Sequence, residues 1–232
     1  MNSLNLYSKI EPYLDFQDEI DELYDAFLKI CEELKVQKVI DIGCGQGEFL
    51  LQLQEMSITT FGTDLSSEQV KVCNSKGLDV ACVDISKITD KFDCATAIFD
   101  VLNYMDKKTL ETFVKNTYDL LLPSGYFLFD INTLFGFEDV ADGSLNINLE
   151  DKFIAIDAVF SDKILTTNIV LFSQNEAGIY TKEEDFITQY FHEKNAVKKL
   201  LDKCGFEIKQ IVNFHLHSDE KADKLIFICQ KQ

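Results

Sequence analysis

Three glycines at alternate positions separate a β-branched run from an apolar helical pattern. Glycine lacks a Cβ, so the backbone there can take a positive φ and approach a ligand closely. The run from Val39 to Phe49 therefore predicts a strand, a glycine turn and the start of a helix. Such a unit forms a nucleotide-binding crevice at the carboxyl edge of a parallel sheet. The turn residues expected to contact the ligand are Gly43, Cys44, Gly45 and Gly47.

Carboxylates stand at the ends of the expected strands. Asp64 ends the second strand, where it can accept both hydroxyls of a ribose, as NAD and adenosyl ligands both require. Asp84 ends the third strand and can accept from an adenine amino group, with Leu65 and Ile85 on the two faces of the ring. Asp41 ends the first strand and can orient the glycine turn or receive an ammonium through water. The structural alternative for each acid is a helix N-cap.

A ligand with a ribose, an adenine and an amino-acid head group would use all three acids. S-adenosylmethionine has these parts, and its positive sulfonium suits a crevice lined by carboxylates that include Asp100. The dinucleotide fingerprint G-x-G-x-x-G is not met, because Glu48 stands three residues after Gly45. A NAD-dependent oxidoreductase stays open as the weaker alternative.

With these motifs the chain resembles the class I S-adenosylmethionine-dependent methyltransferases, over residues 35–132 and again over 193–230. The resemblance implies S-adenosylmethionine as cofactor, S-adenosylhomocysteine as its product, and methyl transfer to N or O of a small molecule by in-line displacement. It also assigns Phe99, Asp100 and Asn103 to the cofactor. The segments that resemble family motifs are Val39–Phe49, Phe61–Ser66, Val83–Ile85, Phe99–Tyr104 and Pro123–Asp130.

The resemblance is strongest for small-molecule methyltransferases with an Asp-x-Leu-Asn-Tyr segment after the fourth strand, here Asp100–Tyr104, and an antiparallel insertion that shapes the acceptor pocket. Such relatives often carry His and Arg on the last insertion strand, where this chain has Phe186, Ile187, Thr188 and Gln189. No acceptor is therefore carried over from them. The candidate catalytic residues are Asp100, Tyr104 and His192. His215 and His217 lack a third ligand in register, so no metal is expected.

Alternating strands and helices predict an α/β fold with a parallel sheet covered on both faces. The resemblance implies a doubly wound, seven-stranded Rossmann-like sheet with its last strand antiparallel, plus a small antiparallel β insertion. Residues 133–150 are expected to form a loop. The expected strands of the main sheet after the first are Ile58–Asp64, Asp79–Asp84, Phe92–Asp100, Tyr126–Ile131, Phe206–Phe214 and Lys224–Gln230, and those of the insertion are Phe153–Phe160, Ile164–Ser173 and Ile179–Phe191.

Three parts are expected along the chain. Residues 1–34 form an N-terminal lid segment and a helix from Asp15, because Pro12 forbids a regular helix through that point. Residues 35–132 and 193–232 form the cofactor-binding methyltransferase domain. Residues 133–192 form a β-rich insertion on the substrate side, whose exposed edge could pair with a second copy in a homodimer.

Composition narrows the class of partner. The net charge is −18 and all 22 basic residues are lysines, which argues against a nucleic-acid partner. The seven cysteines form no C-x-x-C pair, and no membrane span or signal peptide is found, so the cytoplasm is expected. Two further alternatives stay open. One is a protein or RNA methyltransferase, and the other is a module that binds an adenosyl ligand without catalysis.

Overall fold

The structure is a computed structural model that describes residues 3–232. Met1 and Asn2, the first residues of the expected lid segment, lie outside the described residues. In the described part of the chain, no helix is both long enough and apolar enough to cross a bilayer.

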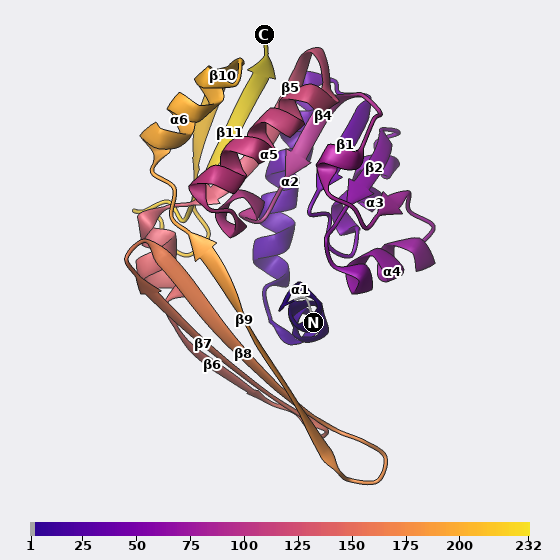
Figure 1. Ribbon diagram of the computed structural model, residues 1–232, viewed down its shortest axis with the longest axis vertical. Coiled ribbons are helices and arrows are strands. Elements are labelled where there is room, and N and C mark those ends of the chain that lie inside the picture. The colour runs from indigo at the N-terminus through magenta and orange to yellow at the C-terminus, as the bar shows by residue number, and fades with distance from the viewer. Residues whose placement is uncertain (1–2) are drawn as a thin grey trace.

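The main sheet has seven strands in the order β3-β2-β1-β4-β5-β11-β10 (Figure 1). β1 to β5 are parallel, and β11 runs antiparallel to both of its neighbours, β5 and β10. The doubly wound, Rossmann-like α/β sheet with an antiparallel last strand is thus confirmed. The strands are β1 (Lys38–Ile42), β2 (Thr59–Thr63), β3 (Val80–Ala81), β4 (Phe92–Ala97), β5 (Leu121–Asn132), β10 (Phe206–Phe214) and β11 (Lys224–Lys231).

Helices cover both faces of this sheet, because successive residues of a strand point to opposite sides. In β5, Phe127 and Phe129 pack with α5 (Lys107–Leu120) and α6 (Lys194–Lys203). Leu128, between them, packs on the other face with α2 (Gln17–Leu34) and α3 (Glu48–Glu55). The sheet is therefore buried on both faces, and its polar chemistry is confined to the ends of the strands.

Helix α4 (Ser67–Ser75) follows β2. The hydroxyl of Ser66 accepts a hydrogen bond from the backbone N–H of Gln69 (3.3 Å), so Ser66 is the N-cap of this helix. At its other end Cys73 packs with Leu78 against Cys44 of the glycine turn. Helix α4 is thereby fixed beside the turn.

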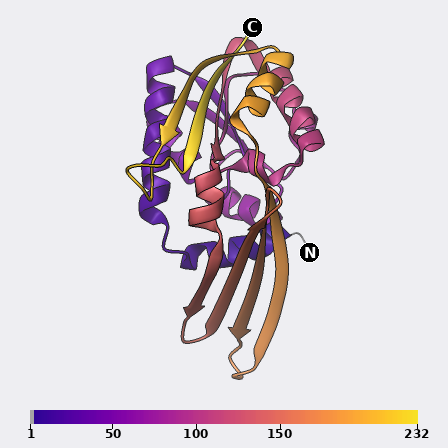
Figure 2. The same cartoon turned by 90° about the vertical axis from the view of Figure 1, so that its left-hand side faces the viewer.

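A second sheet, of four antiparallel strands, extends away from the main sheet (Figure 2). Its strands are β6 (Gly143–Asn148), β7 (Lys152–Ser161), β8 (Ile164–Gln174) and β9 (Tyr180–Tyr190). All lie within the predicted insertion, residues 133–192, although the division into domains stays a prediction. The expectation of a plain loop over 133–150 is wrong, since this stretch contains a π-helical turn, Gly136–Ala141, as well as β6. β6 is mostly exposed and gains its partners only by pairing with β7.

The N-terminal segment lies between the insertion and the main domain (Figure 1). It forms a helix, α1 (Ser3–Ile10), followed by a 3-10 turn, Glu11–Tyr13, which begins just before Pro12. Leu6 and Ile10 are buried against Ile154, Ile169 and Leu171 of the insertion sheet. A helix was expected only from Asp15, but the chain before Pro12 is also helical as far as Ile10, because the insertion sheet supplies the apolar surface that this short helix needs.

The third strand is shorter than expected. Only Val80 and Ala81 pair with β2, whereas the run Asp79–Asp84 is apolar enough to predict a longer strand. β3 is the edge of the sheet, and the chain turns into a 3-10 helix, Ile85–Lys87, soon after it. β3 is short because it lies at the edge of the sheet, where a strand can pair on one side only.

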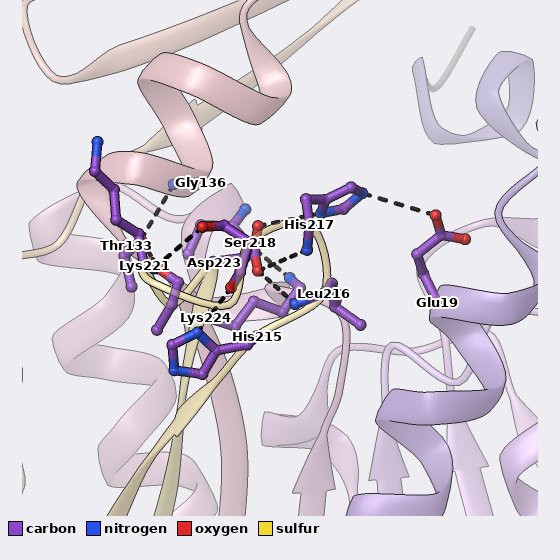
Figure 3. A network of polar contacts seen from close by, with 12 residues as sticks. Glu19, Thr133, Gly136, His215, Leu216, His217, Ser218, Lys221, Asp223 and Lys224 are labelled. Carbon is purple, nitrogen blue, oxygen red and sulfur yellow. Dashed lines mark hydrogen bonds and ion pairs between the residues drawn. The ribbon is translucent and has the colours of Figure 1, made fainter.

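The loop between β10 and β11 is held by Asp223 (Figure 3). One carboxylate oxygen accepts from the backbone N–H of Leu216 (2.5 Å) and of His217 (3.2 Å), and the other lies 3.1 Å from Nδ1 of His217. Nε2 of His217 lies 3.7 Å from a carboxylate oxygen of Glu19 on α2. His217 therefore joins this loop to α2.

Candidate active site

The glycine turn has the geometry that its sequence predicts. Gly43, Gly45 and Gly47 have φ values of 75°, 52° and 83°, in the left-handed region where side chains are strained. A Cβ on Gly43 would lie 2.8 Å from Val101, and one on Gly47 would lie 2.3 Å from Leu78. A Cβ on Gly45 would meet nothing within 4 Å. The turn is therefore closely packed on both sides, and the space beside Gly45 is open to a ligand.

Asp64 joins the glycine turn to the start of α4. The backbone N–H of Gly45 donates to one oxygen of its carboxylate (3.0 Å), and that of Ser66 donates to the other (2.7 Å). Burial raises the pKa of Asp64, and these N–H groups limit the rise. Each oxygen keeps a second lone pair. The half-buried carboxylate is thus fixed beside the open side of Gly45 and can accept two ligand hydroxyls.

Asp41 lies beneath the turn at the end of β1 and is 3% exposed. The hydroxyl of Thr96 on β4 donates to its carboxylate (2.6 Å). Burial raises the pKa of Asp41 to about 7, because an isolated charge is unfavourable in a dry site, and nearby Asp64 adds to the rise. A cationic ligand would favour the ionised form.

The residues assigned to adenine differ in placement. Asp84 is exposed and caps the 3-10 helix after β3 by accepting from the backbone N–H of Ser86 (2.9 Å), and hydrogen bonding to Ser86 lowers its pKa. Ile85 is 4% exposed and packs in the core beneath the sheet, whereas Leu65 is 57% exposed. In this structure Asp84 therefore acts as an N-cap, which is the structural alternative given for it above. Its role toward adenine stays a prediction.

A second charged group lies where β4 and β5 end. Phe99 and Asp100 are both in the left-handed region, with φ of 62° and 51°. The backbone N–H of Asp100 donates to Asp130 on β5 (3.0 Å). Nζ of Lys224 on β11 lies 2.7 Å from the carboxylate of Asp100 and 3.0 Å from that of Asp130. The strained turn is thus held by an ion cluster whose members are far apart in sequence.

The insertion also contacts this cluster. The side-chain amide of Gln189 on β9 donates to the Asp100 carboxylate, and Lys224 donates to Asn132 (2.7 Å). Burial alone would lower the pKa of Lys224, but Asp100 and Asp130 hold it above its usual range. Burial raises the pKa of Asp130, and its second carboxylate oxygen is buried without a hydrogen-bond partner within residues 3–232. Lys224 is therefore the counter-ion of both carboxylates.

The remaining predicted residues lie on or against the 3-10 helix Val101–Tyr104. Asn103 is fully buried, donates to the carbonyl of Tyr190 (2.8 Å) and accepts from the backbone N–H of Asn132 (3.0 Å). Nε2 of His192 lies 3.1 Å from the carbonyl of Leu102, and burial lowers its pKa. Both side chains thus have structural partners here. The assignment of His192 as a base and of Asn103 to the cofactor stays a prediction.

Tyr104 lies at the end of this helix and packs with the apolar cluster that α1 and the insertion share. Burial raises the pKa of its phenol, and the charge of Asp100 adds to the rise. The phenol is therefore protonated at neutral pH and can donate or accept a hydrogen bond. It is poorly suited to act as a base unless a ligand changes its surroundings.

The N-terminal segment closes one side of this edge. Asn5 on α1 accepts from the hydroxyl of Ser66 (2.7 Å). The carboxylate of Glu11 accepts from the amide of Gln69 on α4 (2.8 Å) and from that of Gln46 in the glycine turn (3.5 Å). Burial raises the pKa of Glu11. The segment is therefore bonded to both elements that flank Asp64.

Several of these residues were missed by reasoning from sequence. Lys224 opens a strand whose first six residues are all buried, so a lysine there was a signal of a buried ion pair. Gln189 was noted only as a departure from related sequences. For Glu11 no pattern distinguished it from an ordinary residue of an N-terminal segment.

The cofactor expected from the sequence fits what the site offers. The open side of Gly45 allows a close approach to the backbone, and the Asp64 carboxylate keeps lone pairs for two hydroxyls. Asp41 and Asp100 place negative charge near a positive ligand. The glycine turn and its neighbouring acids therefore match a cationic nucleoside with a ribose.

Comparisons with known proteins agree with this geometry. Residues 39–125 match the family model described as a methyltransferase domain. YqeM of Bacillus subtilis (strain 168), which is named as a methyltransferase, is 27% identical and is aligned over 94% of this chain and 97% of its own. The match to this relative therefore extends well beyond the segment that the family model covers.

Solved structures show the same fold. A crystal structure of an S-adenosylmethionine-dependent methyltransferase from Clostridium acetobutylicum ATCC 824 has a TM-score of 0.80 at 22% identity and covers 98% of this chain and 99% of its own. The sugar N-methyltransferase KedS8 from Streptoalloteichus sp ATCC 53650 has a TM-score of 0.75 at 15% identity, with 99% and 92% covered. CalS10 from Micromonospora echinaspora, an amino pentose methyltransferase solved with S-adenosylmethionine bound, has a TM-score of 0.70 at 16% identity, with 91% of each chain covered.

The motif order, the seven-stranded sheet with its antiparallel last strand, and the match over residues 39–125 all point to one family. Residues 39–125 match a methyltransferase domain, and the whole chain has the fold of solved S-adenosylmethionine-dependent methyltransferases.

Proposed function

We propose that this methyltransferase acts on N or O of a small molecule, which binds where β4 and β5 end. One observation carries the proposal: α1 and the insertion sheet pack together next to Tyr104. Tyr104 follows Asp100 by four residues on the 3-10 helix after β4. Two elements outside the main sheet therefore cover the acceptor side, which favours a small acceptor over a folded macromolecule.

The charge of the chain supports the same choice. A net charge of −18 and the absence of arginine disfavour a basic face for RNA or DNA. KedS8 and CalS10, which share its fold, act on a sugar nitrogen and an amino pentose by name. Because their identity to this chain is low, these two proteins support only the inference that the acceptor is small.

The chain's residues have defined tasks in this reaction. When bound, S-adenosylmethionine supplies a methyl group on a positive sulfur. Asp64 and the glycine turn would bind and orient the ribose. The carboxylate of Asp41 would attract the positively charged end of the ligand. Asp100, held by Lys224 and Gln189, would orient the acceptor, and α1 would limit the access of water. Alignment of this kind contributes about 7 kcal/mol or more in favourable cases.

A titration followed by a screen tests the proposal. Calorimetry should show S-adenosylmethionine binding at micromolar concentration with no response to NAD. A screen for transfer of a tritiated methyl group should then find an acceptor among small amines, phenols and carboxylates. Binding without transfer to any of them would favour a module that binds the adenosyl ligand without catalysis. The assignments of Asp100, Tyr104 and His192 as catalytic residues would be tested in the same assay.

Two further expectations belong to this proposal. The cytoplasm is the expected compartment, and free thiols at all seven cysteines are compatible with it. A homodimer through the insertion would cover Val159 (52% exposed) and Phe186 (57% exposed). Light scattering over a range of concentrations would show whether a dimer forms, and Phe186→Lys should weaken it. A monomer at all concentrations would contradict this expectation.

A further inference from the structure

Three tyrosines stand around the acids at the end of the strands. Tyr7 lies on α1, Tyr24 on α2 and Tyr104 on the 3-10 helix after β4. Each ring is only half-buried, yet its surroundings are close enough that burial raises the pKa of its phenol. Within residues 3–232 none of the three hydroxyls has a hydrogen-bond partner. None of the three is among the buried polar atoms that lack a partner, so each hydroxyl keeps accessible surface and can be reached by a ligand.

These tyrosines fall into two groups by the apolar clusters that they join. Tyr24 joins the cluster that contains Phe49, two residues after Gly47 of the glycine turn. Its ring contacts Phe49 and Phe99, with centroid distances of 5.2 and 5.5 Å. Tyr24 therefore lies on the cofactor side.

Tyr7 and Tyr104 belong to the other side. Both are influenced by Asp100 and Glu11, and both pack on the apolar cluster of the insertion sheet. They come from segments about a hundred residues apart in the sequence, yet both phenols remain without partners. Two independent elements thus bring free hydroxyl groups to the acceptor side, next to Asp100.

The charge on this side is negative. Lys224 is fully engaged by Asp100 and Asp130, so one positive charge faces two carboxylates. The Asp100 carboxylate keeps 15% of its side-chain surface exposed, whereas that of Asp130 keeps none. The chain has no arginine to bind an anion elsewhere. An acceptor that carried a carboxylate or phosphate at the reacting group would be repelled here.

Resting on the proposed function, we propose that the methyl acceptor is an amine, held with its nitrogen between the Asp100 carboxylate and the hydroxyls of Tyr7 and Tyr104. An ammonium donates to a carboxylate in a charge-assisted hydrogen bond, and phenol oxygens accept its remaining N–H groups. The ammonium proton passes to solvent before attack. The freed nitrogen lone pair then forms the new N–C bond while the C–S bonding pair stays on sulfur, which becomes a neutral thioether.

Binding of matched probes tests the proposal without the natural acceptor. Saturation-transfer NMR would compare cyclohexylamine, cyclohexanol and cyclohexanecarboxylate, and in parallel glucosamine, glucose and glucuronate, on the chain loaded with S-adenosylhomocysteine. We expect the amines to bind and the carboxylates not to bind. Equal binding of amines and carboxylates, or no binding of either amine, would overturn the proposal.

Variants assign the binding to these residues. Asp100→Asn should weaken amine binding by about tenfold to a hundredfold, the loss of one charge-assisted hydrogen bond. Tyr7→Phe should weaken it by about two- to tenfold, because a neutral hydrogen bond is lost. Tyr13→Phe is the matched control and should bind as the parent does, since the ring of Tyr13 lies under Lys152 (5.5 Å). Unchanged amine binding in Asp100→Asn would overturn the proposal.

Two measurements separate this inference from the proposed function. If S-adenosylmethionine binds and tritium is transferred only to phenols or carboxylates, the proposed function stands and the amine inference is wrong. If tritium is transferred to no acceptor, the proposed function fails, and the probe binding alone decides whether the amine site exists.

Discussion

The two halves of the carboxyl edge are built in different ways. On the cofactor side, Asp41, Gly45 and Asp64 lie within 24 residues of one another in the sequence, and the Asp64 carboxylate accepts from the backbone N–H groups of Gly45 and Ser66. A more distant partner is Thr96, which donates to Asp41. On the acceptor side, Asp100 is paired with Lys224, which lies 124 residues away, and with Gln189 of the insertion. The first half is a local motif, whereas the second exists only after the whole chain has folded.

This difference separates recognition of the cofactor from choice of the acceptor. The cofactor side depends mainly on the glycine turn and on the strands and helices next to it. The acceptor side depends on β11, on the insertion and on α1, so changes in any of them alter it. We expect variants on the acceptor side to affect stability strongly and variants on the cofactor side to affect ligand affinity strongly.

The largest effect is expected at Lys224. Lys224→Met would leave the carboxylates of Asp100 and Asp130 buried without a counter-ion, which typically costs about 3–5 kcal/mol of stability. Urea denaturation would measure the free energy of unfolding. The loss should be smaller at pH 5 than at pH 8, because protonation removes the unpaired charge. The control is Lys209→Met, which removes an exposed ion pair with Glu207 and should change stability by at most about 1 kcal/mol. Equal losses of stability in the two variants would show that Lys224 contributes no more than an exposed ion pair does.

The next effect is on cofactor affinity at Asp64. Asp64→Ala removes the acceptor of two ligand hydroxyls and should lower the affinity for S-adenosylmethionine by about a hundredfold. The chain should stay folded, although the backbone N–H groups of Gly45 and Ser66 also lose their acceptor. Asp84→Ala is the comparison, since Asp84 is an exposed cap and should matter less. Unchanged affinity for S-adenosylmethionine in Asp64→Ala would show that the ribose is held elsewhere.

Two glycines of the same turn should respond differently. Gly47→Ala would place a Cβ 2.3 Å from Leu78 and should lower stability by about 2 kcal/mol through overpacking and backbone strain. Gly45→Ala meets no protein atom within 4 Å, so its stability loss should be about 1 kcal/mol, from strain alone. Its affinity for S-adenosylmethionine should nonetheless fall, because the methyl group enters the ligand's space. Thermal unfolding and calorimetry would measure both quantities. Normal affinity in Gly45→Ala would show that no ligand approaches this residue.

The smallest effect concerns the pH dependence of stability. The pKa of Asp41 is about 7 in the folded protein, against an ordinary value of 3.8. Between these values the unfolded chain is ionised and the folded one is protonated, so the contribution of Asp41 to stability falls as pH rises from 4 to 7. Urea midpoints at pH 5 and pH 8 should reveal a loss of about 1–2 kcal/mol that is absent in Asp41→Asn. The asparagine can still accept the hydrogen bond of Thr96. The same pH response in both proteins would place the titration in another group.

The insertion illustrates how far a sequence pattern can predict pairing. β7, β8 and β9 were predicted within a few residues because their apolar alternation is strong. β6 was missed because its residues are mostly exposed and its alternation is weak. The buried residues of α1 face that same sheet, so helix and sheet stabilise each other. Short elements of this kind depend on partners that local propensity does not encode.

By itself, the sequence determined the α/β fold, the glycine turn and the acids that follow the first strands. These features arise from strand and helix periodicity and from the conformational freedom of glycine, which act over a few residues. The tertiary structure decided which side chains surround the acceptor. Lys224, Gln189, Glu11 and Tyr7 come from distant segments, and each is placed by the pairing of β11, by the insertion or by the packing of α1. Contacts between such segments depend on how whole elements pack together, so they cannot be predicted from the local sequence pattern around each residue.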